Sequence, residues 1–209
     1  MTRLIDLDAA PDFILTDEGR LLAANQNEPG SRVYQPKFSG DNEWYTPAKY
    51  VDMAREVMGT IDTDPASNPT AQRTVRASTY YTAETNGLDK EWHGKVWMNP
   101  PYSRDLMPKF AAKVVAEYRS GRCTEAIVLT NNATDTAWFA SFFEAASAFC
   151  FTRGRIRFES PTKRNGGTLQ MGQVFTYLGT RPERFASVFA EIGHCMHAAN
   201  DHSALARAA

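Results

Sequence analysis

The stretch KVWMNPPY, residues 95–102, joins a short apolar run to an amide, two prolines and an aromatic side chain. The run 95–98 predicts a buried strand, so Asn99 to Tyr102 fall where a strand ends and a loop begins. In open α/β sheets, ligands bind at the carboxyl ends of the strands. The stretch therefore predicts an α/β fold and the edge of the sheet at which a site lies.

These four residues suit the chemistry of a planar amino group. Asn99 offers an acceptor oxygen, and Pro101 restricts Pro100 to an extended conformation, which fixes the direction of the Pro100 carbonyl. Tyr102 adds a flat face that can stack on an attached ring. Two such acceptors could hold both hydrogens of an amino group, as methylation of a base would need. A simple Asn-Pro turn after a strand is the structural alternative.

Length and composition suit one soluble globular domain with a terminal extension. The chain has 209 residues and a net charge of −1, and it lacks an apolar run of about 18 residues, the length of a membrane-spanning helix. Three widely spaced cysteines (Cys123, Cys150 and Cys195) favour a reducing compartment, so we expect a cytoplasmic protein. We divide the chain into a loosely ordered acidic arm at 1–43, a folded domain at 44–195 and a tail at 196–209.

Apolar periodicity predicts strands that alternate with helices, which indicates a mostly parallel α/β sheet. The runs 155–158 and 173–178, separated by a polar loop, predict a closing hairpin with an antiparallel strand at or near an edge. The segment 194–197 contains two histidines and a cysteine but matches no common zinc spacing, so we interpret it as a frayed helix and expect no metal site. The remaining expected strands are 61–64, 95–98, 126–129 and 149–152. We expect a first helix that is capped by Thr46, and three further helices at 106–118, 135–146 and 182–192.

One candidate for a cofactor site follows the predicted strand 61–64. Asp64 could hold the amino or hydroxyl groups of a cofactor, and the small Ala66 after Pro65 would let a ligand approach the backbone. An Asp-Pro turn accounts for these residues equally well.

A second candidate precedes the first predicted helix. Trp44, Thr46 and Pro47 could form the wall of a site for an adenine-containing ligand, and the aromatic ring could lie against a sulfonium through cation–π attraction. The alternative is a hydrophobic staple that fixes the start of the helix.

A basic segment near the end of the domain could contact nucleic acid. Alternation places Arg153, Arg155 and Arg157 on one face of a strand, and Lys163 and Arg164 follow in a Gly-rich loop. Such a hairpin can contact phosphates. The structural alternative for the same pattern is a solvent-exposed strand face with no binding role.

Taken together, these segments resemble one family, the phage-type DNA N-6-adenine methyltransferases, often called phage Dam. The resemblance runs from about Asn42 to Arg184, and the order and spacing of its pieces make it specific. The pieces are Glu43-Trp44-Tyr45-Thr46-Pro47, Asp62-x-Asp64-Pro65-Ala66-Ser67, Asn86-Gly87-Leu88 with Trp92, Asn99-Pro100-Pro101-Tyr102-Ser103, Thr134-Asp135-Thr136-x-Trp138-Phe139 and Gly154-Arg155-Ile156-x-Phe158.

The resemblance implies a Rossmann-like methyltransferase fold, S-adenosylmethionine as methyl donor and adenine in double-stranded DNA as acceptor. Asn99 to Tyr102 would be the catalytic motif, with Tyr102 stacking on a base flipped out of the duplex. The segments around Trp44 and Asp64 would border the cofactor, although 64–67 lacks the glycines usual after the first strand. A phage- or prophage-encoded enzyme would act in the host cytoplasm.

Two alternatives remain open at this point. The motif Asn-Pro-Pro-Tyr also suits cytosine N4 or a protein glutamine amide, because each is a planar amino group. A non-catalytic DNA-binding or interaction protein with this fold is the other alternative, motivated by the acidic arm and the near-neutral charge.

Overall fold

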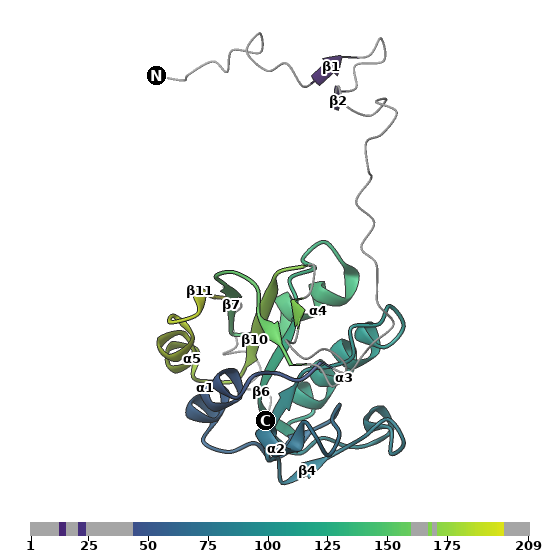
Figure 1. Cartoon of the computed structure of the whole chain (residues 1–209), viewed down its shortest axis with the longest axis vertical. Helices are drawn as coiled ribbons and strands as arrows, with labels where there is room; N and C mark the ends of the chain where they lie inside the picture. Colours follow the sequence, from purple (N-terminus) through teal and green to yellow (C-terminus); the bar gives the residue numbers. More distant parts are fainter. Residues whose placement is uncertain (1–12, 16–20, 24–43, 160–166, 169–170, 199–209) are drawn as a thin grey trace. The chain divides into compact units, whose positions relative to one another are not determined.

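The computed structural model describes residues 13–15, 21–23, 44–159, 167–168 and 171–198. The chain divides into two compact units, Met1–Lys37 and Phe38–Ala209. In the first unit, strands β1 (Phe13–Leu15) and β2 (Leu21–Ala23) pair antiparallel. All further elements belong to the second unit (Figure 1).

A seven-stranded sheet forms the centre of the second unit, in the order β11-β7-β10-β6-β5-β3-β4. The four strands β4, β3, β5 and β6 run parallel to one another, which confirms the α/β class. The seven strands are β3 (Thr63–Asp64), β4 (Thr79–Tyr80), β5 (Gly94–Met98), β6 (Cys123–Asn131), β7 (Ala148–Thr152), β10 (Gln173–Leu178) and β11 (Gly193–His197).

The segment 173–178, predicted as an antiparallel strand at or near an edge, forms β10 inside the sheet, while the edge strand β11 is also antiparallel to its neighbour β7. Strand β10 is antiparallel to both of its neighbours, β6 and β7. Every residue of β10 is buried, and a strand covered on both faces and both edges belongs in the interior of a sheet. The predicted hairpin partner forms β8 (Arg157–Phe158), which pairs with β9 (Gly167–Thr168) in a separate small sheet.

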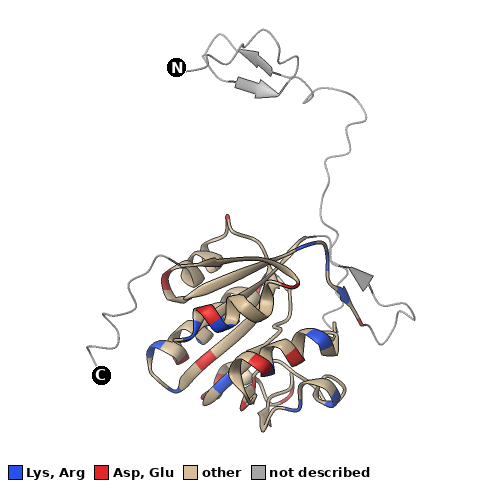
Figure 2. Cartoon of the chain, turned by 90° about the vertical axis from the view of Figure 1, so that its left-hand side faces the viewer, with Lys and Arg blue, Asp and Glu red and all other residues tan. Residues whose placement is uncertain are grey.

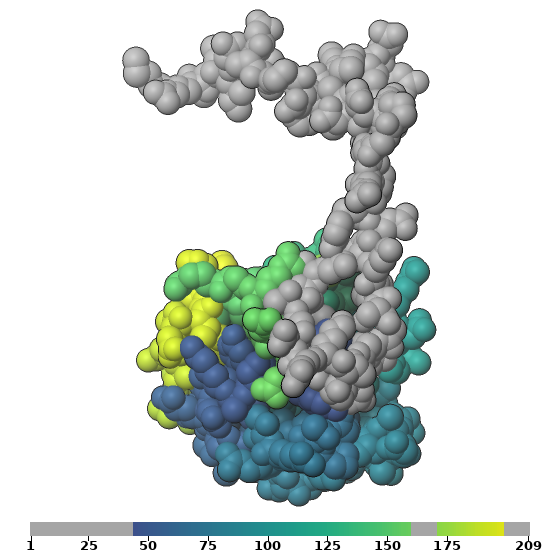
Figure 3. Space-filling model, viewed as in Figure 1, coloured from purple at the N-terminus to yellow at the C-terminus, as the bar shows by residue number. Residues whose placement is uncertain are grey.

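Helices cover the sheet on both faces, and each face has its own apolar cluster. Helices α1 (Ala48–Met58) and α5 (Pro182–Phe189) pack together over one cluster, and α3 (Met107–Arg119) and α4 (Ala137–Ala145) pack over the other. Figure 3 shows the segments of α1 and α5 side by side. Strand β5 contributes Trp97 to the first cluster and Val96 and Met98 to the second. Successive side chains of a strand point to opposite faces, so an uninterrupted apolar run serves both clusters.

Two local predictions were wrong. Helix α1 begins at Ala48 with Pro47 as its N-cap, and Thr46 makes no capping hydrogen bond. The segment interpreted as a frayed helix is the edge strand β11, which places Cys195 opposite Cys150 of β7. Gly193 permits this close pairing, because a Cβ there would lie 2.2 Å from the Phe151 carbonyl oxygen. Among the described residues, no helix has the length and apolar character needed to cross a membrane.

Candidate functional site

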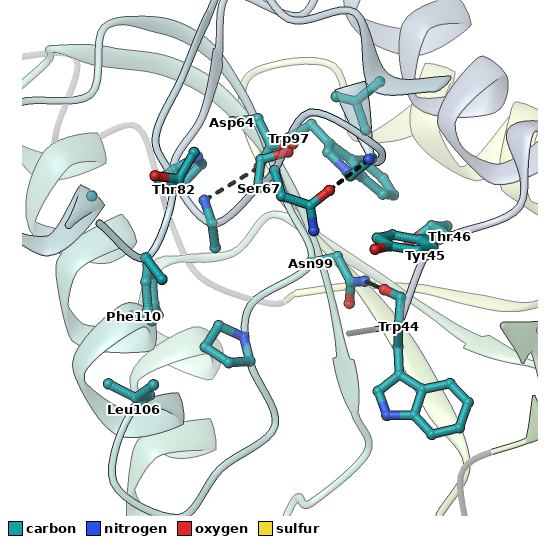
Figure 4. A pocket seen from close by; sticks show the side chains of 18 of the residues that line it. Trp44, Tyr45, Thr46, Asp64, Ser67, Thr82, Trp97, Asn99, Leu106 and Phe110 are labelled. Carbon is teal, nitrogen blue, oxygen red and sulfur yellow. Dashed lines mark hydrogen bonds between the residues drawn. The ribbon is translucent and has the colours of Figure 1, made fainter. Parts of the chain in front are cut away.

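A cavity of about 350 Å³ lies at the carboxyl ends of β3 and β5. The two strands are parallel, with Thr63 opposite Val96, so Asp64 and Asn99 emerge at the same edge of the sheet. The volume of the cavity falls within the usual range for small-molecule sites. Figure 4 shows Trp44, Tyr45 and Thr46 on one side of the cavity and Leu106 and Phe110 on another. The cavity is lined by residues 44–46, 64–68, 71, 74–75, 82–83, 86–88, 97, 99, 101, 106 and 110.

The Asn99 amide is held from two sides. Its Nδ2 donates to the main-chain carbonyl of Trp44 at 3.1 Å, and its Oδ1 accepts from the Tyr102 hydroxyl at 2.8 Å (Figure 4 shows the first bond). The same hydroxyl lies 3.3 Å from the carbonyl oxygen of Leu129 in β6. Asn99 therefore enters the cavity wall in a fixed orientation.

The structure separates the four residues of the predicted catalytic motif. Asn99 and Pro101 line the cavity, whereas Pro100 is buried and neither Pro100 nor Tyr102 is among the lining residues. The Tyr102 ring packs edge-on against Phe158, with ring centroids 6.3 Å apart. Burial raises the pKa of the Tyr102 hydroxyl well above its usual range, so the hydroxyl remains a donor.

A buried carboxylate forms another part of the wall. Asp64 is 2% exposed, and its oxygens accept from Gln72 Nε2 at 2.9 Å and from the Ala66 amide at 3.3 Å. Burial raises the pKa of this carboxyl to about 6, although hydrogen bonds from Ser67, Ala66 and Gln72 favour the charged form. A carboxyl at the margin of a cavity can accept from a ligand hydroxyl or pair with a ligand cation.

Sequence reasoning assigned no role to the wall at 82–88. Gly87 is buried there, and a Cβ at this position would lie 2.0 Å from the Pro65 carbonyl oxygen. Its carbonyl accepts from Trp92 Nε1 at 2.7 Å, which ties the loop to the core below α3. The Asn86-Gly87 turn signal was visible in the sequence, but nothing local indicates that this turn packs against 64–66.

Most of the predicted cofactor residues line the cavity. Trp44, Thr46, Asp64, Pro65 and Ala66 do so, whereas Pro47, the N-cap of helix α1, lies outside the lining. The Thr46 side chain, predicted to cap, is buried at the cavity wall, and its Oγ1 has no hydrogen-bond partner among the described residues. An unpaired buried hydroxyl is costly, so this atom is suited to meet a polar group of a bound ligand.

The basic segment differs from the expected single strand. Gly154 has a φ of +82° and bends the chain, so only Arg157 of the three predicted arginines lies in β8. Arg153, Arg155 and Arg157 are nevertheless exposed, while the intervening Ile156 is buried (Figure 2 shows the basic stretch in blue). Lys163 and Arg164 lie outside the described residues.

The basic segment is hydrogen bonded to the cavity wall. The amide of Tyr45 donates to the Glu159 carbonyl and the amide of Glu159 donates to the Tyr45 carbonyl, both at 2.9 Å. Phe158, just before this bridge, packs edge-on against Trp44 with ring centroids 6.5 Å apart. The bridge joins the basic residues to the segment that holds Asn99.

Comparison with known proteins gives two matches. Residues 34–177 match the family model described as DNA N-6-adenine-methyltransferase (Dam). A protein of Escherichia phage T1 named DNA N-6-adenine-methyltransferase is 31% identical over 99 residues. That alignment covers 46% of this chain and 38% of the phage protein, so it spans well under half of the relative's length.

Proposed function

Because this chain belongs to the DNA N-6-adenine-methyltransferase (Dam) family, we propose that it methylates the N6 amino group of adenine in DNA. The observation that carries the proposal is the Asn99 amide, held in a defined orientation at the wall of a ligand-sized cavity. The phage T1 protein, which bears the same activity in its name, supports it. The parallel half of the sheet and its interior antiparallel strand support the finer assignment of a Rossmann-like methyltransferase fold.

The cavity residues fit S-adenosylmethionine, which when bound supplies a methyl group on a positively charged sulfur. Trp44 and Tyr45 offer aromatic faces, which attract cations and stack on planar rings. The Asp64 carboxyl can accept from hydroxyls or pair with an ammonium group, and Thr46 Oγ1 can pair with a further polar group. Pro65 and Ala66 keep the adjacent wall small and apolar.

The chain's own contribution to the reaction is to hold the amino group. Asn99 Oδ1 and the Pro100 carbonyl would accept its two hydrogens and draw the nitrogen away from conjugation with the ring. Positive charge develops on this nitrogen as it is alkylated, and fixed acceptors stabilise that charge more than they stabilise the neutral ground state. The proton can leave after transfer, so the scheme needs no general base.

Double-stranded DNA is the proposed partner, with the target adenine flipped out because its amino group is inaccessible in the stack. Arg153, Arg155 and Arg157 would contact phosphates, and Lys163 and Arg164 would extend this surface. Exposed arginines beside the cavity wall support this assignment, since phosphate contacts position a protein on DNA.

The decisive experiment combines Asn99→Ala with Asn132→Ala. Asn132 is an exposed asparagine outside the cavity lining, so it is the matched control. Transfer of labelled methyl groups to DNA should fall by about two to three orders of magnitude in Asn99→Ala and stay at the wild-type level in the control. Calorimetry should give similar S-adenosylmethionine affinities for all three proteins.

The products separate the remaining alternatives. Nucleoside analysis of the methylated DNA distinguishes adenine N6 from cytosine N4, and labelled protein extract tests glutamine as acceptor. A wild-type chain that binds no S-adenosylmethionine would support the non-catalytic alternative, and near-native turnover in Asn99→Ala would refute the role of the amide.

A further inference from the structure

The orientation of the Asn99 amide is set by the main-chain carbonyl of Trp44. The Trp44 carbonyl can only accept a hydrogen bond, so the group 3.1 Å from it must be Nδ2. A flipped amide would place two acceptor oxygens against each other. With Nδ2 on the Trp44 carbonyl, Oδ1 faces the Tyr102 hydroxyl and accepts from it at 2.8 Å. The hydroxyl carries one hydrogen, and the Leu129 carbonyl, at 3.3 Å, is the longer of its two contacts.

The Tyr102 side chain is placed to act on Asn99. Its ring lies outside the cavity lining and packs edge-on against Phe158, which itself packs edge-on against Trp44. Its hydroxyl reaches only Asn99 Oδ1 and the Leu129 carbonyl among the contacts of the described residues. The ring is thus anchored by packing, and the hydroxyl is directed at the amide.

We propose that Tyr102 is a positioning residue, whose hydroxyl holds Asn99 with Nδ2 toward Trp44 and Oδ1 available as an acceptor. An amide oxygen has two lone pairs, so one remains for an incoming amino hydrogen while Tyr102 occupies the other. This inference rests on the proposed function for its kinetic consequence. It differs from a stacking role, because stacking requires only the ring of Tyr102 and positioning requires the hydroxyl.

Tyr102→Phe separates the two roles, since it keeps the ring and removes the hydroxyl. We expect kcat to fall on the order of tenfold to a hundredfold, while the KM for DNA and the affinity for S-adenosylmethionine change less than about twofold. Tyr81→Phe is the matched control, because the Tyr81 hydroxyl also approaches a main-chain carbonyl, that of Glu91 at 3.4 Å. Wild-type kcat in Tyr102→Phe would overturn the proposal.

A double-mutant cycle tests whether the hydroxyl acts through the amide. In an Asn99→Ala background, Tyr102→Phe should cause less than about a twofold further loss of kcat, because the group to be positioned is already gone. Losses that multiply would show that Tyr102 acts independently of Asn99, which would overturn the proposal.

Nuclear magnetic resonance provides a readout that needs no activity. In the full chain labelled with ¹⁵N at asparagine, the Nδ2 hydrogen that Asn99 donates to the Trp44 carbonyl, assigned by its absence in Asn99→Ala, should exchange slowly with water. Tyr102→Phe should accelerate this exchange at least about tenfold, and Tyr81→Phe should leave it unchanged. Rapid exchange in the wild type would overturn the proposal even if Tyr102→Phe failed to fold. Slow exchange in a protein that methylates no DNA would instead refute the proposed function alone.

Discussion

Asp64→Asn is expected to change the pH dependence of folding stability. The carboxyl is buried at the cavity wall, where burial raises its pKa from 3.8 to about 6. Between these two pH values the folded protein binds a proton that the unfolded chain has already released. The free energy of unfolding therefore falls as pH rises through this window. The stabilisation from Asp64 is fully present below about pH 4 and is lost above about pH 6.

The size of the effect follows from the two pKa values. At about 1.4 kcal/mol per pH unit, the rise from 3.8 to about 6 corresponds to roughly 3 kcal/mol of stability lost between pH 4 and pH 7.5. For a domain of this size that is a melting-temperature change of about 6–12 °C. Asparagine carries no charge, so Asp64→Asn should lack this component. Any hydrogen bond lost to Gln72 affects the variant at both pH values and cancels in the comparison.

Urea unfolding at pH 4 and pH 7.5, followed by tryptophan fluorescence, measures the double difference directly. The difference in unfolding free energy between Asp64→Asn and the wild type should shift by roughly 3 kcal/mol in favour of the variant at the higher pH. Asp105→Asn removes an exposed carboxylate near Tyr102 and should follow the wild type. Parallel pH profiles for Asp64→Asn and the wild type would refute the reasoning about burial.

Three further perturbations test the cavity wall, the core and the basic segment. Gly87→Ala places a Cβ 2.0 Å from the Pro65 carbonyl oxygen, so the affinity for cofactor, measured by calorimetry, should fall at least about tenfold. The free energy of unfolding, measured by thermal melting, should fall by about 1–3 kcal/mol. An unchanged affinity would mean that this wall is not part of the cofactor site. Arg181→Met removes the cation 2.7 Å from buried Glu125 and should lower the free energy of unfolding, measured in urea, by roughly 2–3 kcal/mol. This loss is smaller than for a fully buried ion pair because the guanidinium is partly exposed. Equal stability would contradict a role for this ion pair. Arg153→Gln should weaken DNA binding and lower the slope of log K against log salt by about one, measured by fluorescence anisotropy; an unaltered slope would exclude a phosphate contact.

The parts of the fold that the sequence predicts are those with local causes. The run 95–98 is apolar without interruption, and it forms β5 with Asn99 at its carboxyl end. Asp64 was placed correctly at the end of its strand for the same reason. The position of β10 was not predictable in this way, because 173–178 has the same apolar character whether it pairs at an edge or between β6 and β7.

The details of the site depend on contacts between distant segments. Asn99 donates a hydrogen bond to the carbonyl of Trp44, 55 positions away. Every residue has a main-chain carbonyl, so the residue type at position 44 does not predict this contact. The loop at Gly87 packs closely against the Pro65 carbonyl, and this contact between distant segments exists only in the folded chain. The sequence thus indicated the chemistry of the amide and the carboxylate, whereas their partners required the tertiary structure.

The bridge between Tyr45 and Glu159 has a consequence for how the protein acquires its activity during folding. It joins a segment before the first helix of the domain to one that follows β7, so the wall it supports is complete only when these two distant segments have come together. Contacts of such long sequence separation form slowly in folding. A fragment that ends before Phe158 would lack the bridge and bind cofactor poorly, and cofactor at about a hundred times its Kd would stabilise the whole domain by roughly 2.7 kcal/mol. Ligand binding therefore serves as a reporter that these two distant segments have paired.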